Sequence, residues 1–180
     1  MKFMIASDIH GSLYYCQKLI DSFEKENCNK LLLLGDILYH GPRNDLPKNY
    51  SPKEVIELLN KHSDKIMCVR GNCDTEVDQM VLTFPILADY AILSHNNTLI
   101  YATHGHVYNE NNLPPLQIGD ILLHGHTHVP KCTKHETYTY LNPGSVSIPK
   151  ENSHHGYMLF EDGLFTWKNF DGDIIKTFKI

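Results

Sequence analysis

Residues 31–36 read Leu31-Leu32-Leu33-Leu34-Gly35-Asp36, and the rest of the chain is interpreted around them. Four consecutive leucines are typical of a short strand that is buried on both faces, and the glycine marks a tight turn at its end. Asp36 then follows the carboxyl end of the strand, where open α/β sheets bind their ligands. A carboxylate in such a place is poorly hydrated and needs a partner. We therefore expect Asp36 to lie at the centre of a metal site.

The segments on either side of this strand predict a parallel sheet. Residues 2–7 and 65–69 are apolar runs typical of strands, and each run ends in a polar cluster. Apolar residues at helical spacing over residues 12–27 and 51–62 place a helix between consecutive strands. The order strand–helix–strand–helix–strand predicts parallel pairing with right-handed crossovers.

The second half of the chain is rich in strands. Asn96-Asn97 lies between two apolar runs and predicts a hairpin. The strands expected in this half cover residues 90–93, 99–103, 120–123, 138–141, 156–160, 164–169 and 174–179. A mixed first half and a β-rich second half fit two sheets packed face to face. The expected fold is α/β, a four-layer αββα sandwich of two mixed β-sheets flanked by helices, with residues 1–180 as a single domain.

Composition and charge narrow the class of protein. The net charge is −5 and no basic block occurs, which argues against extended nucleic acid or a membrane surface as a partner. No apolar run approaches the ~20 residues needed to cross a bilayer, and the apolar start of the chain is too short for a signal peptide. The five cysteines are odd in number and form no C-x-x-C pair, which favours reduced thiols and a cytoplasmic protein.

Five of the expected strands are followed by side chains that bind metals. In chain order these side chains are Asp8 with His10, Asp36, Asn72, His104, and His126 with His128. A lone histidine after a strand is usually structural. The pairs Asp8/His10 and His126/His128 are more informative, because period two in an extended segment points both side chains to the same side. Taken together, the five clusters indicate a metal centre.

These clusters, in this order, resemble the motif set of the calcineurin-like metallophosphoesterases: D-x-H, G-D, G-N-H-[DE], a histidine and G-H-x-H. The matching segments are Asp8-Ile9-His10, Gly35-Asp36, Gly71-Asn72-Cys73-Asp74, Thr103-His104-Gly105-His106 and Gly125-His126-Thr127-His128. Within that superfamily, Gly41-Pro42-Arg43-Asn44 and Asn142-Pro143-Gly144-Ser145 make the chain most similar to the small bacterial YfcE-type phosphodiesterases.

The resemblance implies a cofactor of two divalent metal ions. The first ion would be held by Asp8, His10, Asp36 and His128, and the second by Asp36, Asn72, His104 and His126, with Asp36 as the bridge. Carboxylate, amide and imidazole ligands suit borderline ions, so Mn²⁺ is the expected metal and Fe, Co, Ni or Zn are alternatives. Two divalent ions carry more positive charge than the carboxylates of Asp8 and Asp36 neutralise, so the site stays net positive and can bind an anionic phosphate ester. The implied activity is a phosphodiesterase in which a metal-bridging hydroxide attacks phosphorus in line.

Cys73 departs from the family pattern, because many relatives have a histidine at this position. A thiol with an ordinary pKa of about 8.5 is a poor proton donor to a leaving alkoxide, so Cys73 favours diesters or better leaving groups. The alternative is that Cys73 only fills space beside the metals. Arg43 either clamps a phosphate or is solvated, and Asp74 either orients Cys73 or caps a following turn. The candidate catalytic residues are Asp36, Asn72, Cys73, His104 and Arg43.

Two other functions stay open at this point. A phosphomonoesterase would use the same site. A protein-binding scaffold is the alternative from another class, because a eukaryotic retromer subunit shares the architecture; retention of all seven ligand positions argues against it. The expected partner is a small phosphate ester, and the sequence leaves homo-oligomerisation open.

Overall fold

The structure is a computed structural model that describes every residue from 1 to 180. It contains three α-helices, α1 (Leu13–Lys25), α2 (Pro52–Asn60) and α3 (Glu76–Gln79), and a 3-10 turn at Ser63–Lys65. One sheet is formed by β1 (Phe3–Ala6), β2 (Lys30–Leu33), β3 (Ile66–Cys68), β9 (Gly156–Glu161), β10 (Leu164–Asn169) and β11 (Ile174–Lys179). The other is formed by β4 (Ala91–His95), β5 (Thr98–Ala102), β6 (Ile121–Leu123), β7 (Lys131–Lys134) and β8 (Thr139–Asn142).

The leucine strand β2 lies between β1 and β3 and is parallel to both, as predicted. Leu31 and Leu33 belong to a core on the helix side of the sheet, whereas Leu32 and Leu34 belong to a core on the opposite side. All four side chains are at most 1% exposed. The prediction of a strand buried on both faces is therefore confirmed.

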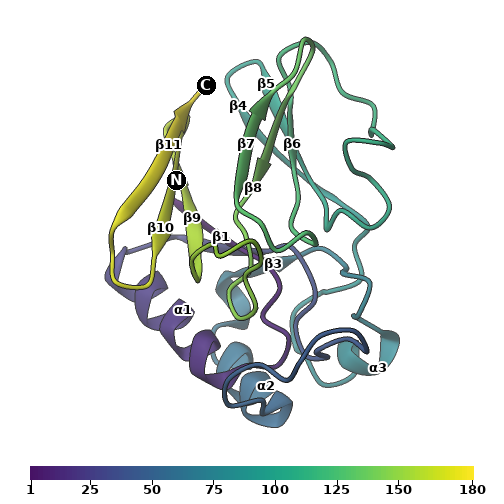
Figure 1. Cartoon of the computed structure of the whole chain (residues 1–180), viewed down its shortest axis with the longest axis vertical. Coiled ribbons are helices and arrows are strands. Elements are labelled where there is room, and N and C mark those ends of the chain that lie inside the picture. Colours follow the sequence, from purple (N-terminus) through teal and green to yellow (C-terminus); the bar gives the residue numbers. More distant parts are fainter.

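Both sheets are mixed, and they pack face to face (Figure 1). The six-stranded sheet has the order β11-β10-β9-β1-β2-β3, and the five-stranded sheet has the order β4-β5-β6-β8-β7. The core between them combines side chains of β1 and β2 with side chains of β5, β6 and β8. This arrangement confirms the predicted α/β fold class with two mixed sheets.

The helices are distributed unevenly over the two sheets. α1 and α2 cover the outer face of the six-stranded sheet and share its outer core. On the outer face of the five-stranded sheet, the chain supplies Leu116 from a loop, which packs against Leu122, Tyr138 and Tyr140. The fourth layer expected from the sequence is thus loop rather than helix, and Figure 1 shows this side of the molecule as strands and loops.

All seven strands expected in the second half are present, including the hairpin of β4 and β5 at Asn96-Asn97. The sequence analysis missed β7 and α3. The four residues of β7, Lys-Cys-Thr-Lys, form an edge strand with no fully buried side chain, so they carry no apolar alternation. The four residues of α3 are too few to show a helical period.

The five cysteines are all free, and three of them are buried. None of the helices combines the length and the apolar composition that a membrane span requires.

Candidate metal centre

The loops that follow β1, β2, β3, β5 and β6 converge at one edge of the sheet pair. Backbone hydrogen bonds tie the first two of these loops together, from Asp8 N–H to Gly35 C=O at 3.1 Å and from His10 N–H to Asp36 C=O at 2.9 Å. All seven side chains that the sequence singles out as metal ligands lie at this convergence, in two adjoining groups.

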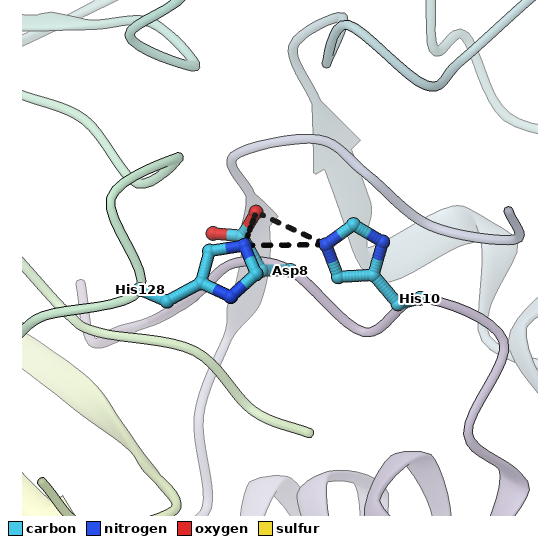
Figure 2. A group of neighbouring side chains, drawn as sticks. All are labelled: Asp8, His10 and His128. Atoms are coloured by element: carbon cyan, nitrogen blue, oxygen red, sulfur yellow. Dashed lines mark hydrogen bonds and ion pairs between the residues drawn. The ribbon is translucent and has the colours of Figure 1, made fainter. Parts of the chain in front are cut away.

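The first group contains Asp8, His10 and His128 (Figure 2). The two imidazole Nε2 atoms are 3.3 Å apart, and Asp8 Oδ1 is 3.2 Å from His128 Nε2 and 3.6 Å from His10 Nε2. All three side chains are buried. Burial disfavours the charged carboxylate, but the neighbouring side chains of His10, His128 and His104 hold the pKa of Asp8 well below its usual range.

The second group is centred on His104. Its Nε2 atom is 3.5 Å from Asp36 Oδ2, 3.0 Å from Asn72 Oδ1 and 3.1 Å from His126 Nδ1. Asp36 Oδ2 is also 3.6 Å from His10 Nε2, so this one carboxylate faces both groups. The position of Asp36 between the two histidines fits the bridging place that the resemblance implies.

The chemistry of these atoms fits a metal centre. His10, His104 and His128 each direct Nδ1 at a backbone carbonyl oxygen, at 2.7, 2.6 and 2.8 Å. A carbonyl can only accept, so Nδ1 carries the proton and each Nε2 presents a lone pair to the centre. Asp8 Oδ1 is buried there without a hydrogen-bond partner. Lone pairs that face one another at such distances, with no proton between them, suit cations.

The local backbone is not the extended one assumed from the sequence. Five of the seven side chains stand on residues with positive φ, namely Asp8 (61°), His10 (48°), Asp36 (56°), His126 (64°) and His128 (62°). The left-handed region is uncommon for residues with a side chain and costs about 1 kcal/mol or more each. Asp8 and His10 do meet, but through a turn, and His126 and His128 lie in different groups. The period-two argument for a shared side was therefore wrong.

Asp74 supports this strained backbone from behind. Its carboxylate accepts hydrogen bonds from the backbone N–H groups of Asp36, Ile37 and Gly71, at 2.8, 2.9 and 2.7 Å. The sequence analysis considered that Asp74 orients Cys73 or caps a following turn. It did not predict these hydrogen bonds, because they connect two loops that are far apart in the sequence. Gly71 is required here, since a Cβ on it would lie 2.1 Å from Asp36 Oδ1.

A cleft of about 430 Å³ opens beside the centre, and we call it the arginine cleft. Its lining residues are Asp36, Gly41, Pro42, Arg43, Asn44, Asn72, Cys73, His126, Thr127, His128 and Lys150. The structure thus brings Arg43 and Cys73 to the ligand residues. Lys150 was missed by the sequence analysis, because no motif contains it and only its fold position brings it here.

Cys73 is held close to the bridging carboxylate. Its backbone N–H donates to Asp36 Oδ1 at 2.8 Å, and its thiol receives a hydrogen bond from Asn72 Nδ2 at 3.2 Å. Burial and the Asp36 carboxylate raise the pKa of Cys73 to about 12. The side chain is therefore a neutral thiol at physiological pH.

A second cleft, of about 230 Å³, lies on the other side of His126, and we call it the glutamate cleft. Its lining residues are Gly105, His106, Asn109, Glu110, Asn111, His124, His126 and Thr127. His126 and Thr127 line both clefts and so form the border between them.

The fold and this ligand set define a class of protein that the comparisons identify. Residues 1–162 match the model of the calcineurin-like phosphoesterase superfamily domain. The chain belongs to the calcineurin-like phosphoesterases, as the motifs predicted, and it is a metal-dependent phosphoric ester hydrolase.

Among its relatives is the phosphodiesterase YfcE of Escherichia coli strain K12. The two chains are 43% identical over 166 residues, which cover 92% of this chain and 90% of the relative. A probable metallophosphoesterase of Methanothermobacter thermautotrophicus strain Delta H is 30% identical over 118 residues, covering 62% of this chain and 63% of the relative.

Solved structures give the same picture of the fold. YfcE, a phosphoesterase from E. coli, matches with a TM-score of 0.96 at 42% identity, covering 100% of both chains. Vacuolar protein sorting 29 from Cryptosporidium parvum matches with a TM-score of 0.62 at 16% identity over 99% of this chain and 98% of the other. The second likeness shows the shared fold alone.

Proposed function

We propose that the chain is a phosphodiesterase with two divalent metal ions, Mn²⁺ first among the candidates, and that residues 1–180 act as one cytoplasmic domain. The first ion would be held by Asp8, His10, Asp36 and His128, and the second by Asp36, Asn72, His104 and His126. The observation that supports this most strongly is the placement of Asp36, whose Oδ2 lies 3.6 Å from His10 Nε2 and 3.5 Å from His104 Nε2.

When bound, two such ions lower the pKa of a water for in-line attack and offset negative charge on the phosphate. The side chains set the conditions for this chemistry. Carbonyl contacts fix the ring orientation of His10, His104 and His128, so their lone pairs stay aimed inward without reorganisation. Arg43 lines the same cleft as Asn72, and its guanidinium can bind a phosphate group of the substrate through two hydrogen bonds.

Two features favour a diester over a monoester substrate. A diester has two organic arms, and the centre opens into two clefts that meet at His126. Cys73 stands where many relatives have a histidine, and a thiol is a poor general acid at neutral pH, which suits substrates whose leaving group needs little help. The relative YfcE is named a phosphodiesterase, which agrees with both features.

The proposed function is tested by removing and restoring metal. We expect chelation to abolish hydrolysis of bis(p-nitrophenyl) phosphate, and Mn²⁺ to restore it with up to two ions bound per chain. The restored enzyme should cleave this diester faster than p-nitrophenyl phosphate, measured as kcat/KM with metal content determined in parallel. An equal or faster monoesterase would make the protein a phosphomonoesterase, and fewer than one bound metal per chain would favour a scaffold.

Cys73→Ala tests whether the thiol takes part in the hydrolysis of a diester whose leaving group needs no proton. p-Nitrophenolate leaves without a proton, so a thiol that serves as a weak acid is not needed for this substrate. We expect kcat for bis(p-nitrophenyl) phosphate to change by less than about threefold. A loss of about 100-fold with unchanged metal content would show that Cys73 acts on the reacting phosphate itself.

A further inference from the structure

The two clefts that meet at the centre differ in charge. The arginine cleft contains two cations, Arg43 and Lys150, beyond the ligand residues. The glutamate cleft contains no lysine or arginine, and its one acidic side chain is Glu110. The Glu110 carboxylate lies 2.9 Å from His135 Nε2 and 4.0 Å from Lys131 Nζ, and neither of these two side chains lines the cleft. Among the residues that line the two clefts, lysine and arginine therefore occur on one side of His126 only.

Neither cation of the arginine cleft has an acidic side chain within 4.0 Å, so neither charge is neutralised within the chain. The backbone around both cations is held in place. Lys150 N–H donates to the carbonyl of His128 at 3.1 Å, and Asn44 Nδ2 donates to the carbonyl of His40 at 2.8 Å, beside Arg43. Arg43 and Lys150 are thus placed on fixed backbone with their charges free for a ligand.

The charge of these two residues exceeds what the scissile group requires. A phosphodiester carries a single negative charge. Two divalent ions held by Asp8 and Asp36 already leave the proposed centre with a net charge of about +2. Arg43 and Lys150 lie outside the two ligand groups, in the cleft where one arm of a diester would extend. Their excess charge is explained if that arm carries an anionic group of its own.

We propose that the substrate is a phosphodiester whose arm in the arginine cleft carries a second phosphate, bound by Arg43 and Lys150. This proposal rests on the proposed phosphodiesterase function. It also gives the substrate one orientation, because the opposite cleft is lined by Glu110 and by no lysine or arginine that could bind a phosphate. Guanidinium binds phosphate through paired hydrogen bonds, and the ammonium of lysine adds a flexible point charge.

A matched pair of substrates tests this specificity. One is the p-nitrophenyl phosphodiester of glycerol, and the other is the same compound phosphorylated on its terminal hydroxyl. Both release p-nitrophenolate, as water oxygen bonds to phosphorus. We expect the second phosphate to raise kcat/KM about tenfold at low salt. This ratio should fall toward one at about 1 M salt, where the Debye length is about 3 Å.

Variants assign the effect to its residues. Lys150→Met should lower the ratio of the two kcat/KM values to about three, because Arg43 remains, and Lys150→Arg should keep the ratio near its wild-type value of about ten. Lys53→Met, on the exposed first turn of α2, removes the same charge away from both clefts and should leave the ratio unchanged.

The outcomes separate this inference from the proposed function. A wild-type enzyme that cleaves both diesters with a ratio near one would overturn the second-phosphate site and leave the phosphodiesterase intact. A ratio of about ten that Lys150→Met does not reduce would overturn the role of Lys150. If neither diester is cleaved by protein that hydrolyses monoesters, the proposed function fails and the inference fails with it.

Discussion

Asp36→Asn is expected to lower kcat/KM for a phosphodiester by about 10³-fold and to remove metal from both proposed positions. Asp36 Oδ1 accepts from Cys73 N–H, so the amide oxygen of an asparagine would stay on that side. The amide NH₂ would then replace Oδ2 and point a donor at the space between His10 and His104. One substitution thus removes a negative charge and a lone pair from the place where both groups meet.

Metal content per chain, measured beside activity, is the decisive readout for this substitution. His10→Ala and His104→Ala serve as the comparison, because each touches one group and should mainly weaken one of the two ions. The metal-free Asp36→Asn protein should unfold at a temperature no lower than the metal-free wild type, because it loses a buried charge that lies near Asp8. Full activity with two ions bound would contradict the bridging role.

The fold could be predicted from the sequence wherever a buried pattern repeats. The leucines of β2 and the apolar runs of β1 and β3 are covered on both faces of the sheet. Their apolar composition therefore predicts buried strands directly. β7 could not be found in this way, because an edge strand needs no buried side chain and is defined by its pairing with β8. The loop on the outer face of the five-stranded sheet is likewise set by packing, through a single leucine, Leu116.

The site was predictable in its residues but not in its geometry. The motifs contain the side chains that could hold metal, since such chemistry needs Asp, Asn and His. The left-handed backbone at Asp8, Asp36 and His128 could not be predicted from the residue types, because none of them favours that conformation as strongly as glycine does. Lys150 reaches the arginine cleft through the hydrogen bond of its backbone to His128, a contact across more than twenty positions of the chain.

A strained constellation persists only if the structure around it is rigid. Ser145 and Ser147 both donate hydroxyl hydrogen bonds to the carbonyl of Asp8, at 2.9 and 3.1 Å, and so hold the first loop. Asp74 holds the loops of Asp36 and Gly71 to each other. Its carboxylate is the hydrogen-bond acceptor for three backbone N–H groups of these loops.

Asp74→Ala is therefore expected to lower the free energy of unfolding by about 3–5 kcal/mol, although Asp74 is not a proposed metal ligand. The substitution leaves three backbone N–H groups without their partner in a buried place, at about 1–3 kcal/mol for each group that water does not reach. Asp74→Asn should cost less, because its oxygen can still accept from two of the donors. Denaturant unfolding of the metal-free proteins measures both variants against Asp21→Asn, an exposed carboxylate on α1.

The same substitutions should also reduce activity in protein that is still folded. Asp74→Asn loses one of the three hydrogen bonds that hold the loops of Asp36 and Asn72 in place, so the metal-loaded variant should show weaker metal binding by about 10- to 100-fold. Metal titration followed by activity measures this loss. Because the shift is in affinity, excess metal should recover most of kcat.

An Asp74→Ala protein whose unfolding free energy lies within about 1 kcal/mol of the wild type would show that water satisfies the three N–H groups, and the supporting role of Asp74 would be wrong.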